Sequence, residues 1–403
     1  MSPHAHAIAP DAAPLGGPLI TKPMLPIGVL AAVGLAAIAY RFLFGLGAAT
    51  ALNDGYPWGL WIAFDVVTGT ALACGGYAMA ILVYIMNRGQ YHRLVRPALL
   101  TSAFGYTMAG ASVFLDVGRY WALWKVPVYF WHWNLNSVLL EVALCIMAYM
   151  VVVWIELAPA FLERGTTARS ASLRAFSTRA LPLVNKSLLW IIALGMLLPT
   201  MHQSSLGSLM LLAGPRLNAL WRTPLLPLLF LVSCVSMGYA AVVLEGALSS
   251  TVLKRVPERR MLAGLGGAMV PVLVLYLALR VADIVWRGQL SALFAFDVYS
   301  VMSLIELTLF ALAAVMLASR RRRADLGHLF RAAIILIAAG ALYRFDTFLV
   351  AFTPGAHWFY FPSVGEILVT TGLVALEILG YIVLIKLFPI FAGQSRSTAL
   401  GAA

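Results

Sequence analysis

Charged side chains are scarce in this sequence. Only 11% of its 403 residues are Asp, Glu, Lys or Arg, against about 25% in soluble proteins. Hydrophobic residues make up 62% of the chain, the mean hydropathy is +0.90, and no hydrophilic stretch is long enough to fold separately. The composition excludes a soluble protein and predicts one all-α integral membrane domain, because apolar runs recur along the whole length.

Cysteine and histidine are also few, which limits the cofactors that we expect. The three cysteines, Cys74, Cys145 and Cys234, lie in separate apolar runs, whereas an iron–sulfur cluster is normally held by four thiolates. None of the seven histidines falls in the middle of an expected span, although a transmembrane b-type haem needs axial ligands from facing helices. We therefore expect no iron–sulfur cluster, no haem and no bound metal in this chain.

The chain begins with a polar, Pro-rich and Ala-rich segment, MSPHAHAIAPDAAPLGGPLITKP. This segment lacks the basic region and the short apolar region of a secretory signal, so we expect the apolar run that follows to be retained. The predicted organisation is a cytoplasmic tail over residues 1–23, a polytopic membrane domain over 24–390 and a second cytoplasmic tail over 391–403.

Ten apolar runs are long enough to cross a bilayer, for which about 20 residues are needed. They cover residues 24–46, 57–86, 94–117, 134–157, 183–203, 223–249, 261–282, 292–318, 328–350 and 364–388. The second run is too long for a straight crossing, so we expect part of it to tilt or to leave the bilayer. Ten crossings place both termini on the same face.

The basic residues predict the orientation of the chain in the membrane. Of the 28 Lys and Arg residues, 20 fall on the face of the termini and 8 on the other face. Cytoplasmic loops carry an excess of Lys and Arg, so we expect both termini in the cytoplasm. The net charge of +12 then reports orientation, not binding of nucleic acid, and the run Arg320 to Arg323 is a topology anchor.

The loops of the opposite face are rich in aromatic residues. They read NDGYPWGLW, DVGRYWALWKVPVYFWHWN, MHQSSLGSLMLLAGPRLNALW and YRFDTFLVAFTPGAHWFYFPSVGE. Aromatic belts at the membrane interface explain part of this enrichment. The accompanying His, Asp and Arg residues exceed what a belt requires, so we expect a ligand or partner surface on this face.

Several ionisable residues lie at membrane depth, where such groups are costly and are functional candidates by default. With a rise of about 1.5 Å per residue, Glu141 lies roughly 10 Å below the aromatic face. Asp65, Asp116 and His202 are expected at the same level, and Tyr106 near the middle of the third span. This group predicts a site in the outer leaflet. The alternative is that each polar residue hydrogen-bonds a neighbouring helix as packing glue.

Further acids lie at staggered depths, namely Glu245, Glu306 and Glu377. They suit either a proton relay or the same packing role. Arg96, at the cytoplasmic end of the third span, either fixes a carboxylate, contributes to proton uptake or anchors the topology. The run NSVLLEVALCIMAYMVV resembles YSVMSLIELTLFALAAVM, and this weak repeat fits two four-helix bundles, spans two to five and six to nine, with flanking helices.

At these residues the chain resembles a known family. The segments LNDGYPWGLWIAFDVVTGTALACGGYAMA, NRGQYHRLVRPALLTSAFGYT, DVGRYW, NLNSVLLEVAL and LLPTMHQSSLGSLM closely resemble the HybB-type membrane subunit of periplasm-facing NiFe-hydrogenases, within the NrfD/PsrC-like superfamily. The likeness extends over most of the chain.

The resemblance implies a haem-free, quinone-reactive membrane subunit without a hydrogenase active site of its own. It implies three partners, a periplasmic ferredoxin-like iron–sulfur subunit and the small and large subunits of the hydrogenase. Electrons would reduce a quinone, with menaquinone expected, in the first bundle, with coupled proton transfer across the membrane. Site residues expected on this basis are His202, Tyr106, Asp116, Arg119 and Trp58 for quinone binding, Glu141, Asp65, His202 and Tyr106 for catalysis, and Arg96, Glu141, Glu245, Glu306 and Glu377 for the proton path.

Two alternatives remain open from the sequence. One is a related quinone subunit that serves a different periplasmic oxidoreductase, for polysulfide, nitrite or formate. The other is a secondary transporter, since ten helices, buried acids and a hinted repeat suit that class. Transporters often carry Gly or Pro interruptions at matching positions of their two halves, and no such pair is evident here.

Overall fold

The computed structural model describes residues 12–392, and the remainder of the two predicted tails, residues 1–11 and 393–403, lies outside the described residues. The described chain is helical, with two isolated β-bridges and no strand. All ten predicted spans are confirmed as helical segments long and apolar enough to cross a membrane. They are α1 (Met24–Phe44), Trp61–Ile85, Gly89–Asp116, α7 (Val138–Gly165), α8 (Ala171–Leu211), α9 (Leu226–Val252), α10 (Arg259–Trp286), α12 (Val298–Ala318), Leu326–Val350 and α15 (Val364–Leu387).

The second span is not a continuous α-helix. It is divided into the π-helix η2 (Trp61–Thr68), α3 (Gly69–Leu72), α4 (Gly75–Ala80) and the π-helix η3 (Ile81–Ile85). The wider π turn is shown by the backbone N–H of Gly69, which donates to the carbonyl oxygen of Phe64 five residues earlier. Because π turns are uncommon and are frequent at functional sites, this span is a natural place to look for chemistry.

Two more spans are composite, and short helices lie in the loops. The third span is the 3₁₀ turn η4 (Gly89–Leu94) followed by α5 (Val95–Asp116), and the ninth is α14 (Leu326–Phe345) followed by the π-helix η8 (Asp346–Val350). The loop helices are α2 (Leu46–Ala49), η5 (Tyr120–Ala122), α6 (Lys125–Val128), η6 (Phe130–His132), η7 (Gly214–Arg216), α11 (Leu290–Leu293) and α13 (Arg320–Arg323).

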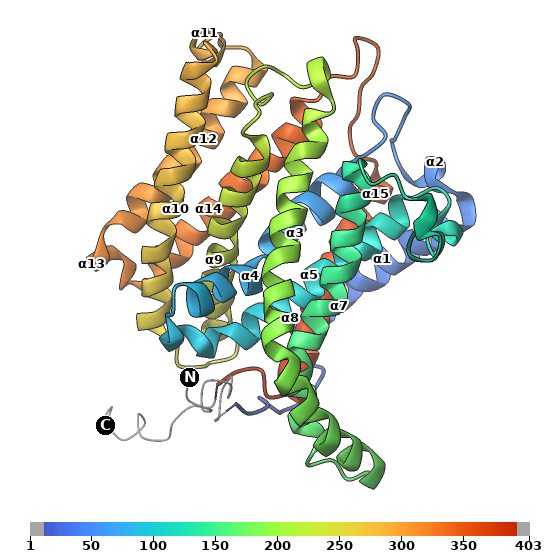
Figure 1. Ribbon diagram of the computed structural model, residues 1–403, viewed down its shortest axis with the longest axis vertical. Helices are drawn as coiled ribbons and strands as arrows, with labels where there is room; N and C mark the ends of the chain where they lie inside the picture. The colour runs from blue at the N-terminus through green and yellow to red at the C-terminus, as the bar shows by residue number, and fades with distance from the viewer. Residues whose placement is uncertain (1–11, 393–403) are drawn as a thin grey trace.

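The spans pack as two four-helix bundles, as predicted. In the first bundle the second span contacts α5, α5 contacts α7, α7 contacts α8, and α8 returns to α4. In the second, α9, α10, α12 and α14 form a similar closed ring (Figure 1). The bundles meet where α9 contacts α4 and α8 and where α14 contacts η2. This seam brings polar side chains of both bundles together.

Helices α1 and α15 form a flanking pair beside the first bundle (Figure 1). They approach closely because glycines face each other, and a Cβ added at Gly34 would lie 2.4 Å from the Cα of Gly372. Small residues at helix contacts are the usual way in which membrane helices pack. Through this pair, α15 is held against α5 and η2.

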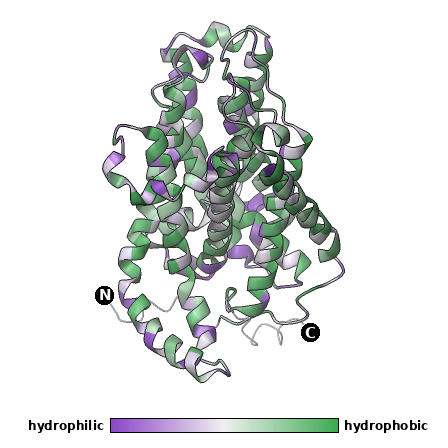
Figure 2. Cartoon of the chain, turned by 90° about the vertical axis from the view of Figure 1, so that its right-hand side faces the viewer, coloured by the Kyte–Doolittle hydropathy of each residue, from purple (hydrophilic) through white to green (hydrophobic). Residues whose placement is uncertain are grey.

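Helix α8 is longer than the predicted span. It begins at Ala171 instead of residue 183 and contains 41 residues, a length of about 60 Å against a hydrocarbon core of about 30 Å. Its first turns project beyond the rest of the molecule with the end of α7 (Figure 1). In Figure 2, hydrophobic residues predominate along the long helices, and the projecting hairpin contains more hydrophilic residues.

Both described ends of the chain lie on one face. Ala13 N donates to the carbonyl oxygen of Phe391 at 3.2 Å, and Ala12 forms a bridge with Ala392. This arrangement agrees with an even number of crossings. In Figure 1 the opposite face carries α11. The assignment of the first face to the cytoplasm remains a prediction from the basic residues.

Candidate functional site

A buried polar network surrounds His202 at the seam between the two bundles. His202, in α8, is fully buried, and its Nε2 lies 3.2 Å from Oγ1 of Thr70 in α3. The Thr70 hydroxyl donates to the carbonyl oxygen of Val66 at 2.5 Å, so its oxygen acts as an acceptor toward the imidazole. An imidazole that carries its proton on Nε2 fits this arrangement, and Nδ1 has no hydrogen-bond partner among the described residues.

Arg344 adds a positive charge to this network from the second bundle. Its buried guanidinium donates to Oε1 of Gln203 at 3.2 Å and to the carbonyl oxygen of Val67 at 3.1 Å. Gln203 in turn donates to Thr70 Oγ1 at 3.0 Å. The chain Arg344–Gln203–Thr70–His202 thus joins α14 to α8 through the irregular second span. Arg344 has no salt bridge with a carboxylate within residues 12–392.

Aromatic side chains complete the surroundings of His202. The ring of Tyr106 in α5 lies 5.6 Å from the imidazole, and Tyr149 in α7 packs edge-on against Tyr106 at 4.4 Å between ring centroids. Both tyrosines are fully buried, and the Tyr149 hydroxyl has no hydrogen-bond partner within the described chain. The structure therefore places Tyr106 and His202 together, as the sequence predicted, and adds Tyr149.

Asp65 lies in the π-helix η2 and is buried among helices. Its carboxylate accepts a hydrogen bond from Oγ1 of Thr370 in α15 at 3.0 Å. Glu377, also in α15, lies near enough for its charge to interact with Asp65. Asp65 is thus buried in protein on the same broken helix as Thr70, but its hydrogen bond is to α15 and not to His202.

Glu141 lies apart from this network. It occupies the first turn of α7, is partly exposed, and its side chain makes no hydrogen bond within residues 12–392. The sequence places it in a long apolar run, but that run cannot show which side of the helix faces protein. Its role in catalysis and proton transfer stays a prediction.

The remaining residues predicted for quinone binding lie toward the aromatic face. Trp58 Nε1 donates to the carbonyl oxygen of Phe348 at 3.0 Å, which ties the start of the second span to η8. Asp116 is partly buried at the end of α5, where Arg41 donates to the neighbouring carbonyl oxygens of Leu115 and Val117. Arg119 is exposed in the loop that follows.

Arg96 serves as a clamp near the opposite face. Its guanidinium donates to both carboxylate oxygens of Glu163, at 2.8 and 2.5 Å, and to the carbonyl oxygen of Pro389 at 3.0 Å. This bidentate pair joins α5 to α7 and to the C-terminal segment. Of its three predicted roles, the geometry matches the fixing of a carboxylate.

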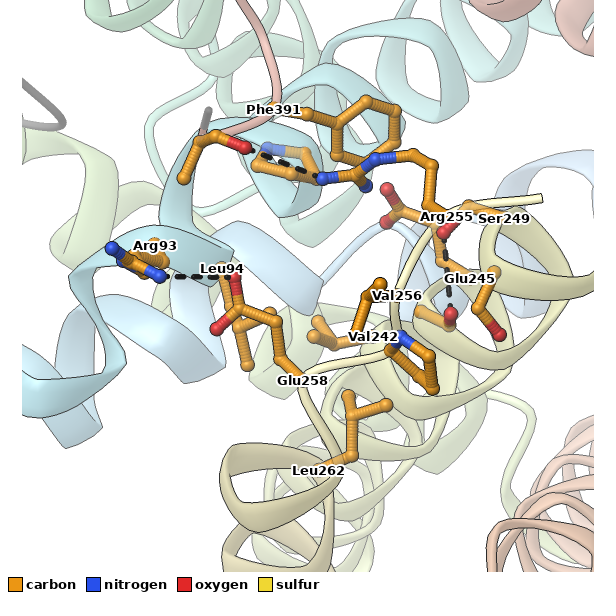
Figure 3. Close-up of a pocket in the computed structure, with 15 residues that line it drawn as sticks. Arg93, Leu94, Val242, Glu245, Ser249, Arg255, Val256, Glu258, Leu262 and Phe391 are labelled. Carbon is orange, nitrogen blue, oxygen red and sulfur yellow. Dashed lines mark hydrogen bonds and ion pairs between the residues drawn. The ribbon is translucent and has the colours of Figure 1, made fainter. Parts of the chain in front are cut away.

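Glu245 borders a small cavity on the face of the chain ends (Figure 3). The cavity has a volume of about 30 Å³, room for about one or two water molecules. Glu245 accepts hydrogen bonds from Thr101 Oγ1 at 3.0 Å and from the Tyr381 hydroxyl. Arg255 lines the same cavity, with its guanidinium 3.7 Å from the centroid of the Phe391 ring, and burial lowers its pKa.

Glu306, in α12, is a buried acid of the second bundle. It is 1% exposed, and its Oε1 accepts a hydrogen bond from Nε1 of Trp221 at 3.0 Å. Sequence reasoning missed its neighbours in this bundle as well as Thr70, Gln203 and Arg344 at the seam. The sequence does show Arg344 as an arginine inside an apolar run. Because it lies near the end of the expected span, however, it was counted with the basic residues of the adjoining loop.

Comparisons with known proteins agree with this architecture. A family model described as "Polysulphide reductase, NrfD" matches residues 48–354. The chain is 44% identical over 386 residues to the "Probable Ni/Fe-hydrogenase 2 b-type cytochrome subunit" of Escherichia coli K12, covering 94% of this chain and 95% of that relative. It is 33% identical over 175 residues to the "Menaquinone reductase, integral membrane subunit" of Nitratidesulfovibrio vulgaris, covering 42% of this chain and 39% of that relative.

The name of the Escherichia coli relative contradicts one expectation from the sequence, that of a subunit without haem, because that relative is named a b-type cytochrome. Axial ligation of such a haem usually takes histidines on facing helices. Within the described chain His202 is the one buried histidine, and its Nε2 is engaged with Thr70. The described side chains do not fit a bis-histidine haem, and no step of the chemistry is assigned to such a group.

Proposed function

Since the chain belongs to the NrfD family, we propose that it passes electrons from an iron–sulfur partner of a NiFe-hydrogenase complex to a quinone, with menaquinone expected, and that proton transfer accompanies this step. The chain is a HybB-like integral membrane subunit of that family. The observation that carries the proposal is the buried network of His202, Thr70, Gln203 and Arg344 beside two tyrosines. The relative named as a menaquinone reductase subunit supports the choice of substrate.

The network has the groups that quinone chemistry needs. Reduction of a quinone consumes two electrons and two protons and converts both carbonyl oxygens to hydroxyls. The free hydroxyl of Tyr149 is suited to donate to a quinone oxygen, and Nδ1 of His202 is suited to accept from a quinol hydroxyl. The positive charge of Arg344 stabilises negative charge that develops nearby. Because His202, Tyr106 and Tyr149 are fully buried, a quinone ring reaches them only after the surrounding helices separate.

The proton supply follows α15 in this proposal. Tyr381, bonded to Glu245 at the cavity, and Glu377 are four residues apart and therefore on one face of the helix. Glu377 is near Asp65, which is held by Thr370 of the same helix. This order, from the cavity through Glu245, Tyr381 and Glu377 to Asp65, runs from the predicted cytoplasmic face toward the site. In this arrangement Arg96 is a clamp beside the route and not a carrier.

The electron donor is proposed to dock on the aromatic face. The loops of this face expose large apolar side chains between polar residues. Trp121 is 64% exposed and Trp131 is 61% exposed. Aromatic residues are enriched in the cores of protein interfaces. A ferredoxin-like iron–sulfur protein, which receives electrons from the small and large hydrogenase subunits, is the proposed partner. A secondary transporter is disfavoured, since the family match covers most of the chain.

The test is hydrogen-dependent quinone reduction by the purified complex, with reduction of an artificial dye by the hydrogenase as the control. Tyr149→Phe removes only the unpartnered hydroxyl, and His202→Gln replaces the imidazole with an amide that is still able to donate to Thr70. We expect both variants to lose most quinone reduction and to retain dye reduction. Wild-type quinone turnover in both variants would remove the site from the mechanism.

One relative supports a different partner. The chain is 26% identical over 237 residues to a selenate reductase subunit of Mesobacillus selenatarsenatis, covering 53% of each protein. Co-purification separates the two cases, because hydrogenase subunits are expected with this chain and a molybdopterin enzyme would show the alternative. The much longer match to the hydrogenase subunit favours the first.

A further inference from the structure

A second cluster of buried ionisable groups lies in the second bundle. Glu306 in α12, Arg280 in α10, and Tyr343 and Asp346 at the junction of α14 and η8 are each at most 1% exposed. None of the four contacts His202, and three of them were not singled out from the sequence. The cluster therefore needs an explanation separate from the network in the first bundle.

These four side chains share a large unmet capacity for hydrogen bonding. Both carboxylate oxygens of Asp346, Oε2 of Glu306, Nε and Nη2 of Arg280, and the hydroxyl of Tyr343 have no hydrogen-bond partner within residues 12–392. Buried polar atoms are almost always paired with protein or ordered water. If these residues were only packing glue between helices, their polar atoms would be bonded across the helices. Six unpaired atoms in one place indicate instead that the cluster binds protons and water.

The two acids form a pair. The carboxyl groups of Glu306 and Asp346 lie near enough for their charges to interact. A carboxylate is only an acceptor, so a hydrogen bond between the two groups requires that one of them carries a proton. Like charges that share a buried site are not both ionised. The pair therefore holds one proton in its resting state and has the capacity for a second.

Arg280 is a positive charge that acts on this pair and on a further acid, Asp283. Asp283 lies 4.0 Å from Arg280 Nη1 but is held more closely by Arg287 Nη2 at 2.6 Å and by Thr223 Oγ1 at 2.5 Å. Arg280 Nη1 donates to the carbonyl oxygen of Leu220 at 2.7 Å, while its other guanidinium nitrogens remain unpaired within the described residues. Its charge acts on Glu306. The other groups facing the pair are Trp221, which donates to Glu306, and the hydroxyls of Tyr276 and Tyr343.

One short segment connects this cluster with the first bundle. Successive residues of a helix are about 100° apart around its axis, so Arg344 and Asp346 point in nearly opposite directions from the end of α14. Arg344 reaches Gln203, which is bonded to Thr70 beside His202, while Asp346 reaches Glu306. The change from α-helix to π-helix at Asp346 occurs at this connection.

We propose that Glu306 and Asp346 form a proton-storing pair in the second bundle. Arg344 is then a positioning residue, through which the number of protons on this pair depends on the negative charge present in the first bundle. This inference rests on the proposed function. An electron that arrives from the iron–sulfur partner adds negative charge beside Arg344, and the pair then takes up one proton to become two neutral carboxyl groups. When quinol forms and the negative charge is removed, the pair releases that proton. Only O–H bonds form and break at the pair.

The experiment uses the complete complex in proteoliposomes supplied with hydrogen and a menaquinone analogue. Glu306→Gln and Asp346→Asn remove one acid each, and Tyr343→Phe removes only the unpaired hydroxyl. The matched controls are Asp297→Asn, at the exposed N-terminal cap of the helix that carries Glu306, and Asp54→Asn, in an exposed loop. Proton release is recorded with a pH dye, and protonated carboxyl groups by infrared difference spectra between oxidised and reduced complex.

We expect the two acid variants to keep quinone reduction and to lose most of the proton release per electron, whereas the two controls behave as wild type. A carboxyl band that changes on reduction of the wild type should be absent from both acid variants and shifted in Tyr343→Phe. In Arg344→Lys the band should persist in the spectrum but should no longer change on reduction, an effect that a purely structural role of Arg344 does not produce.

Unchanged proton release and no lost carboxyl band in the acid variants would overturn the inference and leave the proposed function intact. Release that depends on sodium ions would also overturn it, since the pair would then hold a metal cation. Absence of quinone reduction in the wild type would refute the proposed function instead. In that case a pH titration of the same carboxyl band in the resting complex still tests the pair.

Discussion

Replacing Thr70 with Val tests whether the network around His202 is more than packing. The change removes one hydroxyl and nearly preserves the shape of the side chain. That hydroxyl is fully buried, donates to Val66 at 2.5 Å, and lies 3.0 Å from Gln203 Nε2 and 3.2 Å from His202 Nε2. Thr70→Val therefore leaves two buried donors without their acceptor.

The expected size of the effect follows from these two donors. A buried donor without a partner costs about 1–3 kcal/mol, so the free energy of unfolding should fall by about 2–6 kcal/mol unless the side chains find new acceptors. Loss of the hydrogen bond also frees the His202 ring to turn or to exchange its proton between the two nitrogens. Because about 1.4 kcal/mol corresponds to a tenfold change in rate, we expect quinone reduction to fall about tenfold or more.

The assays are thermal unfolding of the complex in detergent and hydrogen-dependent quinone reduction, with dye reduction as the internal control. Thr70→Ser keeps the hydroxyl and should restore most of the activity. Thr371→Val is the matched control, since its exposed hydroxyl bonds only carbonyl oxygens of its own helix at 2.8 and 3.1 Å. A Thr70→Val complex with wild-type melting temperature and wild-type quinone turnover would refute the reasoning.

Three other changes test separate parts of the molecule. Gly34→Val should separate α1 from α15 and lower the melting temperature, because even a Cβ at this position lies 2.4 Å from Gly372 Cα; unaltered stability would contradict the close packing. Glu163→Gln should destabilise the complex by about 1 kcal/mol, because Arg96 loses its ion pair with a carboxylate that is 37% exposed but keeps the carbonyl oxygen of Pro389; a double variant with Arg96→Met should recover part of this loss in the same unfolding assay. Glu141→Gln should abolish quinone reduction and leave dye reduction intact, and unchanged quinone turnover would remove Glu141 from the mechanism.

Apolar length and family likeness were sufficient to predict the ten spans and the two-bundle arrangement. Each span needs its own run of about 20 apolar residues, so the number of helices follows from local sequence. Polar residues inside such runs are conspicuous, and this explains why Asp65, His202 and Glu306, which are buried in the structure, could be named from the sequence as candidates. The N-terminal extension of α8 was not predicted, because its first turns are polar and a search for apolar runs does not detect a polar helix.

The membership of the polar networks was decided only by the tertiary structure. A spanning helix that is hydrophobic all round gives no indication of which side faces protein, so the sequence could not show that Glu141 is partly exposed and unbonded within the described chain. The partners of Arg344 at Gln203 and Val67 are separated from it by 141 and 277 positions, and no local pattern encodes such contacts. The sequence by itself determined which helices form and that acids lie at membrane depth. The packing of α14 against η2 and α9 determined that the charge of Arg344 lies between the two bundles. A buried arginine is stable only where several helices offer it hydrogen-bond acceptors.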